Sequence, residues 1–320
     1  MLRENFKRRT RKLEILMHGT GAYSEQVELK EGISIHGGYS GHPNWARGVE
    51  YEVQIVSGNP CVIADAVSDV TLAFLVIRAA NNFEETGNST AVLLKNSSMI
   101  YLNNVNIESG HGSSTGSSGS AGAGGTGTGG SGGTSPYSSD RCPEPSIKGN
   151  DGNSGNIGEH GAAGKSFGGY DENGYLPGHG GDGATGTHGH GGGGGGGGSG
   201  GDSICDSYGS SGGGGGAGGC AGGGGKGGTA GGGSFGIWSY KCTDIILRGV
   251  RITTSDGGKG GNGGSGGEGG FQGFGALAGL YGGSDEQGDG GCGGTGGNGG
   301  AGGKGGSGGG GGGGPSIGIV

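Results

Sequence analysis

The densest group of ionisable side chains in this sequence lies in the stretch HGGDGATGTHGH, residues 179–190. Three of these side chains are imidazoles, which suit transition metals such as zinc, copper and nickel. The alternative is that they are exposed tips of a glycine-rich turn and bind nothing. We favour the turn, and we expect neither a metal nor another cofactor. The residues concerned are His179, Asp182, His188 and His190.

No pattern of residues indicates catalysis. Glycine motifs of the GxGxxG type recur so often that they predict no nucleotide site, and a GxxxxGK[ST] loop is absent. Acid–base cleavage of a sugar chain needs two facing carboxyl groups. The positions that we expect to face outward from strands carry no such pair, so we do not expect an enzyme. These positions are Thr71, Tyr101, Asn103, Asn106, Arg248 and Arg251.

The cysteines are even in number and contain no CxxC pair, which argues against a zinc ribbon or a thioredoxin motif. Disulfides formed in an oxidising compartment are the better interpretation. The sequence does not select a pairing. The disulfide candidates are Cys61, Cys142, Cys205, Cys220, Cys242 and Cys292.

Composition excludes a conventional core along the whole chain. Of 320 residues 101 are glycine, and only 28% are apolar, whereas an ordinary domain is roughly 7% glycine and nearly half apolar. The net charge of −8 argues against nucleic acid as a partner. No stretch is long and apolar enough to span a membrane. The basic start is like that of a signal peptide but lacks an apolar stretch after it, so either a leader is missing or export uses another route.

Three stretches share one pattern: VTLAFLVI (70–77), IYLNNVNI (100–107) and IILRGVRI (245–252). Each is apolar at its first, third, sixth and eighth positions. A strand-like residue, Val62, Val92 or Ile237, precedes each central leucine by ten positions. The pattern begins again near the end of the sequence, where Ile319 takes the equivalent position. The segment 27–39 fits as an earlier copy with one extra residue.

The residues that separate the copies all enter after the last apolar position, and they are glycine-rich. Short alternating strands joined by bends of one or two residues suit a parallel β-helix with one copy per rung. Its inward Val, Ile and Leu side chains would stack into a narrow core. The alternative is a short β-sandwich with disordered glycine loops.

The glycine-rich stretches keep a period of three. In residues 290–309 the unit Gly-Gly-X repeats without an error of phase, and residues 149–164 have glycine at every third position. A polyproline-II helix has three residues per turn, so every X would lie on one edge and the glycine edges could hydrogen-bond to neighbouring helices. Collagen would need far more than 7 prolines. A polyglycine-II bundle is the prediction, and a flexible linker is the alternative.

Between residues 259 and 280 the X positions change from polar to apolar. The polar ones are Lys259, Asn262, Ser265 and Glu268. The apolar ones form a packing stripe that we expect to face another layer or another molecule, and it consists of Phe271, Phe274, Leu277 and Leu280. A turn at 285–289 then returns the chain, which predicts a hairpin of two such helices.

The stretch 23–47, with its GGY…W-R residues, resembles the large secreted parallel β-helix repeat proteins of myxobacteria and relatives. The residues that carry the resemblance are Gly37, Gly38, Tyr39, Trp45 and Arg47. This resemblance implies an extracellular location more than an activity. The glycine tracts separately look like the polyglycine-II sandwiches of phage tail-fibre adhesins and of springtail antifreeze proteins.

The predicted fold class is therefore all-β, with right-handed parallel β-helix rungs and glycine-rich insertions forming a polyglycine-II helix bundle. The predicted organisation is a basic segment at 1–22, rungs at 23–110, a glycine-rich insertion at 111–232, a rung at 233–256, a polyglycine-II hairpin at 257–313 and a terminal strand at 314–320.

We expect an extracellular or cell-surface structural protein, a subunit of a self-assembling surface fibre. The partner would be a second copy stacked head-to-tail, through an incomplete final rung that includes Ile317, Ile319 and Val320. The alternatives are a carbohydrate-binding adhesin and an ice-binding protein. The mixed Lys259, Asn262, Ser265 and Glu268 edge disfavours the last, because ice binding needs a flat and regular face.

Overall fold

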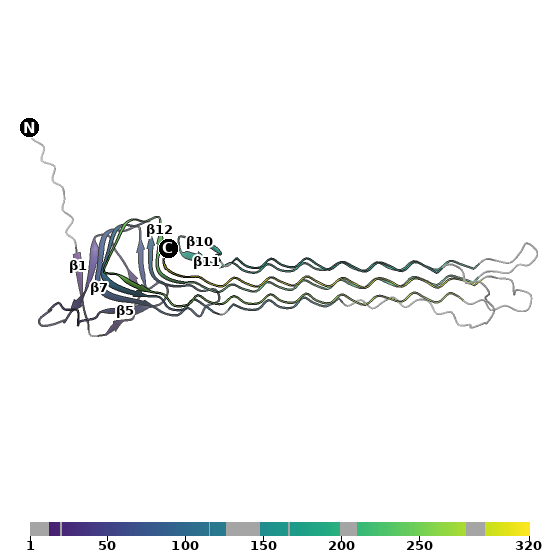
Figure 1. The fold of residues 1–320 in the computed structure, drawn as a ribbon, viewed down its shortest axis with the longest axis horizontal. Coiled ribbons are helices and arrows are strands. Elements are labelled where there is room, and N and C mark those ends of the chain that lie inside the picture. The colour runs from purple at the N-terminus through teal and green to yellow at the C-terminus, as the bar shows by residue number, and fades with distance from the viewer. Residues whose placement is uncertain are drawn as a thin grey trace, which may run out of the picture.

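A computed structural model describes residues 13–19, 21–114, 116–125, 148–165, 167–198, 210–279 and 292–320. These residues form an all-β protein without a helix, and accordingly the described part of the chain has no helix that could cross a membrane. A group of sheets, called the head below, stands at one end, and a bundle of glycine-rich tracts, called the rod, runs away from it (Figure 1).

Two parallel sheets build the head. The first contains β1 (Leu13–His18), β2 (Ala22–Tyr23), β4 (Ile33–Tyr39), β5 (Gln54–Ser57), β7 (Ser68–Ala79), β9 (Ser98–Glu108), β13 (Thr243–Arg248) and β14 (Arg251–Thr253). The second contains β3 (Val27–Glu28), β6 (Val62–Asp65), β8 (Ser89–Lys95), β12 (Ser234–Tyr240) and β15 (Ser316–Ile319). A small antiparallel hairpin of β10 (Gly169–Asp171) and β11 (Gly174–Leu176) lies beside them.

The strand register confirms the repeat read from the sequence. In the second sheet Val62 pairs with Val92, Val92 with Ile237, and Ile237 with Ile319. In the first sheet β9 pairs with β7 on one side and with β13 and β14 on the other, so that equivalent positions of the three copies lie side by side. The glycine-rich insertions all leave the head after the last apolar position of a copy, as predicted.

Bends at equivalent positions join the strands of each copy. Residues with positive φ recur in three columns, which consist of Ala66, Asn96 and Lys241, then Asp69, Met99 and Asp244, then Gly38, Phe74, Asn104 and Gly249. Because the left-handed region turns the chain sharply, each copy bends at the same three places. The inward side chains between the bends are fully buried; they include Val70, Leu72, Leu75, Ile77, Ile100, Leu102, Val105 and Ile107.

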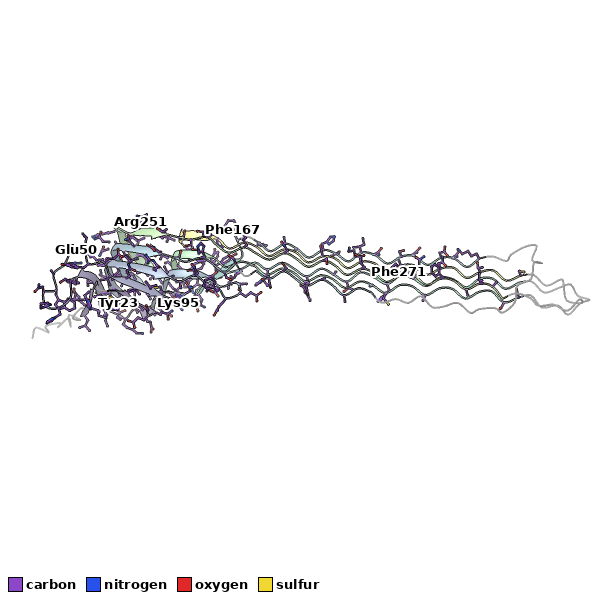
Figure 2. All side chains as sticks on the ribbon, turned by 90° about the horizontal axis from the view of Figure 1, so that it is seen from below. Tyr23, Glu50, Lys95, Phe167, Arg251 and Phe271 are labelled. Atoms are coloured by element: carbon purple, nitrogen blue, oxygen red, sulfur yellow. The ribbon has the colours of Figure 1, made fainter. Side chains whose placement is uncertain are left out.

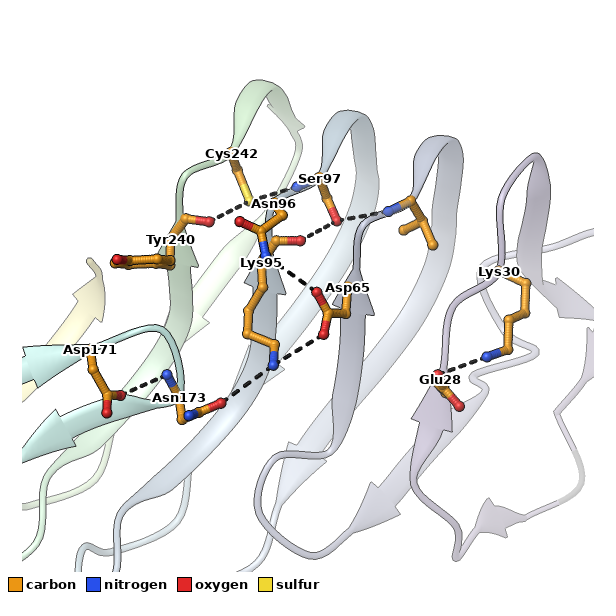
Figure 3. Close-up of polar contacts among 11 residues, drawn as sticks. Glu28, Lys30, Asp65, Lys95, Asn96, Ser97, Asp171, Asn173, Tyr240 and Cys242 are labelled. Atoms are coloured by element: carbon orange, nitrogen blue, oxygen red, sulfur yellow. Dashed lines mark hydrogen bonds and ion pairs between the residues drawn. The ribbon is translucent and has the colours of Figure 1, made fainter.

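Side chains at the bends tie the copies and the hairpin together. Lys95 forms an ion pair with Asp65 of the preceding copy, at 3.1 Å, and donates to Asn173 in the turn of the hairpin, at 3.3 Å (Figure 3). The hairpin also places Tyr175 against Phe235 on the second sheet. The β10–β11 hairpin is thus fixed to the head where the rod begins.

Six tracts make the rod: tract 1 (111–125), tract 2 (148–165), tract 3 (177–198), tract 4 (210–233), tract 5 (254–279) and tract 6 (292–315). Tract 6 is hydrogen-bonded to tracts 2, 3, 4 and 5, and tract 4 to tracts 1, 3, 5 and 6. Tracts 2, 6 and 5 therefore form one layer and tracts 3, 4 and 1 a second. Tracts 5 and 6 run antiparallel, as the predicted hairpin requires.

Candidate functional site

The rod is held by backbone hydrogen bonds that recur at every third residue. In tract 6, the Gly296 N–H donates to the Ala276 carbonyl of tract 5 and the Gly297 N–H to the Gly193 carbonyl of tract 3, both at 2.8 Å. The carbonyl of the third residue, Asn298, accepts from the Gly152 N–H of tract 2 at 2.7 Å. Each three-residue unit of tract 6 therefore contacts several neighbours, and only the third side chain points outward.

Close approach explains why the other two positions are glycine. A Cβ placed at Gly297 would overlap the carbonyl oxygen of Asn150 in tract 2, and one at Gly296 would overlap that of Gly214 in tract 4. The same overlap with a neighbouring carbonyl recurs at Gly299, Gly300, Gly302 and Gly303. Glycine is required here for space rather than for a positive φ.

Carboxylates on edge tracts bind outward-facing backbone N–H groups. Asp151 of tract 2 accepts from the Asn298 N–H at 2.7 Å, and Asp182 of tract 3 accepts from the Gly227 N–H at 2.8 Å. The Asn298 N–H, followed by Lys148, lowers the pKa of Asp151. The ammonium of Lys226, followed by the Gly227 N–H, lowers the pKa of Asp182. Both carboxylates thus favour the ordered rod in their charged form.

Three histidines act in the same way through Nδ1. His160 accepts from the Ser307 N–H at 3.0 Å, and His188 and His179 accept from N–H groups of tract 4 at 3.1 Å and 3.3 Å. The expected turn at 179–190 is wrong, because these residues lie along an extended tract that is hydrogen-bonded to its neighbours. His179, His188 and His190 are exposed, as expected. Among the described residues, no group of His, Cys, Asp and Glu is arranged to hold a metal.

Three of the disulfide candidates are free thiols, which corrects the expectation that all six are paired. They are Cys61, Cys220 and Cys242. Cys61 is buried in the core of the head, where burial raises the pKa of its thiol to about 11. Cys220 lies in the rod, and Cys242 has its sulfur 3.4 Å from the Tyr240 carbonyl oxygen at a bend. None of these three sulfurs forms a disulfide bridge.

Of the remaining cysteines, Cys292 is disulfide-bonded. Cys142 and Cys205 lie outside the described residues. Disulfide bonding therefore does not involve all six cysteines.

The apolar stripe does not pack against another layer of the described chain. Phe271, Phe274 and Leu277 of tract 5 are 87%, 73% and 74% exposed, and Phe271 stands on the surface of the rod far from the head (Figure 2). Leu280 lies outside the described residues. Packing of this stripe against a second molecule, the other expected possibility, stays a prediction.

The predicted assembly residues lie on the edge strand of the second sheet. Ile319 of β15 is 50% exposed and Val320, which follows it, is 38% exposed. Ile317 is instead half-buried against the aromatic cluster of Phe235 and Trp238. Only two of the three side chains are therefore presented to a partner.

Comparison with family models, with curated proteins and with solved structures finds no match.

Proposed function

We propose that the head is a right-handed parallel β-helix and that the rod is a polyglycine-II bundle. Two observations support this finer assignment. Equivalent residues of successive copies pair in parallel register and bend at three repeated positions, and the tracts hydrogen-bond with a period of three residues. The domain limits expected from the sequence stay a prediction, and β1 (Leu13–His18), which pairs with β4, places the start of the head inside the expected basic segment at 1–22.

We further propose that the protein is an extracellular structural protein and a subunit of a surface fibre. The observation that carries this proposal is the hydrogen-bonded rod. A tract such as 177–198 would extend about 70 Å at the rise of a polyproline-II helix, and its neighbours hold it straight. A hydrogen-bonded rod of this kind suits a spacer or stalk better than an enzyme.

Assembly would use the exposed edge of the head. In the described part of the chain β15 pairs with β12 on one side and has no strand on the other, and it carries the exposed Ile319. An open strand edge beside apolar side chains favours the addition of a strand from another copy. Repetition of one such contact gives an open filament rather than a closed ring.

Amide hydrogen exchange measured by NMR tests the rod. The N–H groups of Gly299 and Gly300 donate to neighbouring tracts at 2.8 Å, whereas the Ala301 N–H has no partner among the described residues. We expect slow exchange at the two glycines and at Gly302 and Gly303, and fast exchange at Ala301. Asn298 and Ser307 should exchange more slowly than Ala301, because their N–H groups donate to Asp151 and His160. Uniformly fast exchange would leave the flexible-linker alternative standing and would remove the basis of the structural role.

Electron microscopy over a range of concentrations tests the fibre. An Ile319→Lys variant places a charge on the strand edge, and the matched control is Ile157→Lys, since Ile157 is 67% exposed but lies on the rod. We expect filaments from the native chain and from the control, and isolated molecules from Ile319→Lys. Filaments in all three samples would contradict assembly through β15.

A further inference from the structure

An insertion in one copy of the repeat stands above a bend of the first sheet. In two later copies a single residue with positive φ, Phe74 or Asn104, makes this bend within a continuous strand. In the preceding copy β4 ends at Tyr39 and β5 begins at Gln54, so residues 40–53 are inserted there. Such a loop adds a wall to an otherwise plain sheet.

The loop is held firmly against the sheet. The Arg47 guanidinium lies 4.2 Å from the centre of the Phe74 ring and 5.5 Å from that of Tyr39. The Gly48 N–H donates to the Gly38 carbonyl at 3.0 Å. Gly38 has a φ of 81°, which disfavours a side chain there.

The rest of the GGY…W-R segment closes the loop around these contacts. A Cβ at Gly37 would overlap the Phe74 carbonyl. Trp45 packs edge-on against both His18 and Tyr39. The conspicuous residues of this segment thus act together to position residues 48–53.

A groove of about 520 Å³ lies between the loop and the sheet. Gly48, Val49, Tyr51 and Glu52 form its wall. Its floor comes from neighbouring strands and consists of Phe74, Leu75, Val76, Asn104 and Asn106. A second hollow of about 350 Å³ shares Asn106 and adds Glu108, Arg251 and Thr253, and Figure 2 shows Arg251 on the surface of the head.

The polar groups of this surface are exposed and available. Among the described residues, the side chains of Asn104, Asn106 and Arg251 have no hydrogen-bond partner, and all three are exposed. Asn106 pairs in register with Val76 on one side and with Arg251 on the other, and Val76 pairs with Gln54. Within this row the polar side chains of Asn106 and Arg251 lie on neighbouring strands about 4.8 Å apart, and the apolar Val76 separates them from Gln54.

We propose that this groove binds an uncharged carbohydrate chain. Amides that offer both donors and an acceptor match neighbouring hydroxyl groups, the Glu52 carboxylate can accept from another hydroxyl, and Tyr51 and Phe74 supply half-buried aromatic surface. The groove and the second hollow share Asn106 and together form an extended open surface, which suits a chain of several sugar units. Glu52 and the overall charge of −8 disfavour a polyanion. This proposal does not rest on fibre assembly.

Isothermal titration calorimetry on the full chain, with a panel of soluble oligosaccharides, tests the proposal. The probes are cellohexaose, maltohexaose, chitohexaose and, as an acidic comparison, hexagalacturonate. The variant Asn104→Gly/Asn106→Ala removes both amides; glycine is chosen at 104 because Gly249 occupies the equivalent bend with a φ of 63°. The matched control is Asn103→Ala, on the same strand but outside the groove lining.

We expect at least one neutral probe to bind with a dissociation constant at or below about 1 mM. The double variant should weaken that binding at least tenfold, and the control should leave it unchanged, with thermal midpoints alike in all three proteins. Failure of every neutral probe to bind would overturn the proposal, as would binding of hexagalacturonate alone. Binding that is equally strong in the double variant would show that the carbohydrate site lies elsewhere.

Discussion

At the scale of single residues, the stability of the rod depends on whether each position has room for a side chain. Gly297 faces the Asn150 carbonyl with no room for a Cβ, whereas the side chain of Asn298 points outward. We expect Gly297→Val to cost about 3 kcal/mol, the upper end of the usual range for overpacking, because the contact is with backbone. Asn298→Val loses one hydrogen bond, which the Gly275 N–H donates to Asn298 Oδ1, and should cost about 1 kcal/mol. Urea unfolding measures both; equal losses would refute the packing geometry.

Asp151 and Asp182 should make the rod sensitive to acid. Their pKa values are lowered from the ordinary 3.8 in the folded protein. A carboxyl group with a lowered folded pKa stabilises the fold above its ordinary value, and this contribution is lost as the pH falls through the folded value. We expect the thermal midpoint to fall more steeply below pH 3.8 than that of an Asp151→Asn/Asp182→Asn variant.

The amide variant serves as the control because an asparagine oxygen accepts from a backbone N–H at any pH. Its thermal midpoint should lie below the native one at pH values where the two carboxylates are charged, because it lacks their interactions with Lys148 and Lys226, and the two curves should converge in acid. Superimposable curves over the whole range would mean that the two carboxylates contribute nothing to the rod.

At the scale of elements, the sequence predicts whatever depends on a local period. The apolar positions of 70–77 and 100–107 predicted strands and their partners, because residues that are equivalent in successive copies must stack. The period of three in 290–309 predicted an extended tract in the same way. The neighbours of each tract could not be predicted, because nothing in the local sequence indicates that tract 6 is hydrogen-bonded to four other tracts.

The histidines show where such reasoning fails. In the sequence, His179 and His188 look like turn residues because glycine surrounds them. Their role depends on N–H groups of tract 4, which is more than thirty residues away along the chain. The groove was missed for a similar reason. The outward position of Asn106 was predicted, but the wall that faces it comes from an insertion in a different copy.

The phase of a tract, more than its composition, should determine whether it orders. One extra glycine inserted after Ala301 would move Lys304 and Ser307 into positions that face neighbouring carbonyls, whereas an inserted Gly-Gly-Ser would keep glycine at every close contact. We expect the single insertion to lower the thermal midpoint at least as much as Gly297→Val does. The three-residue insertion should be tolerated with a smaller loss, although it is longer. A larger loss from the three-residue insertion than from the single glycine would show that the stability of the rod does not depend on the period of three.

At the scale of the whole molecule, we expect the rod to depend on the head for its stability more than the head depends on the rod. Ordering one residue costs about 1–2 kcal/mol, and glycine loses the most freedom, whereas a hydrogen bond returns about 0.5–1.5 kcal/mol net. The rod therefore needs its tract ends fixed. A buried serine cluster does this at the junction, where Ser109 and Ser234 bond at 2.9 Å and Ser255 donates to the Ser109 carbonyl at 2.9 Å.

We therefore expect unfolding of the head to unfold the rod, whereas unfolding of the rod should leave the head folded. Leu102 is fully buried in the head, and Leu102→Ala should cost about 2–5 kcal/mol. In that variant we expect the slow amides of tract 6 and of β9 to lose protection at the same lowered temperature, because a rod without its anchors cannot stay ordered. Gly300→Val should instead release the rod amides at a lower temperature while β9 stays protected. Rod amides that remain protected after the head has melted would show that the bundle is stable by itself.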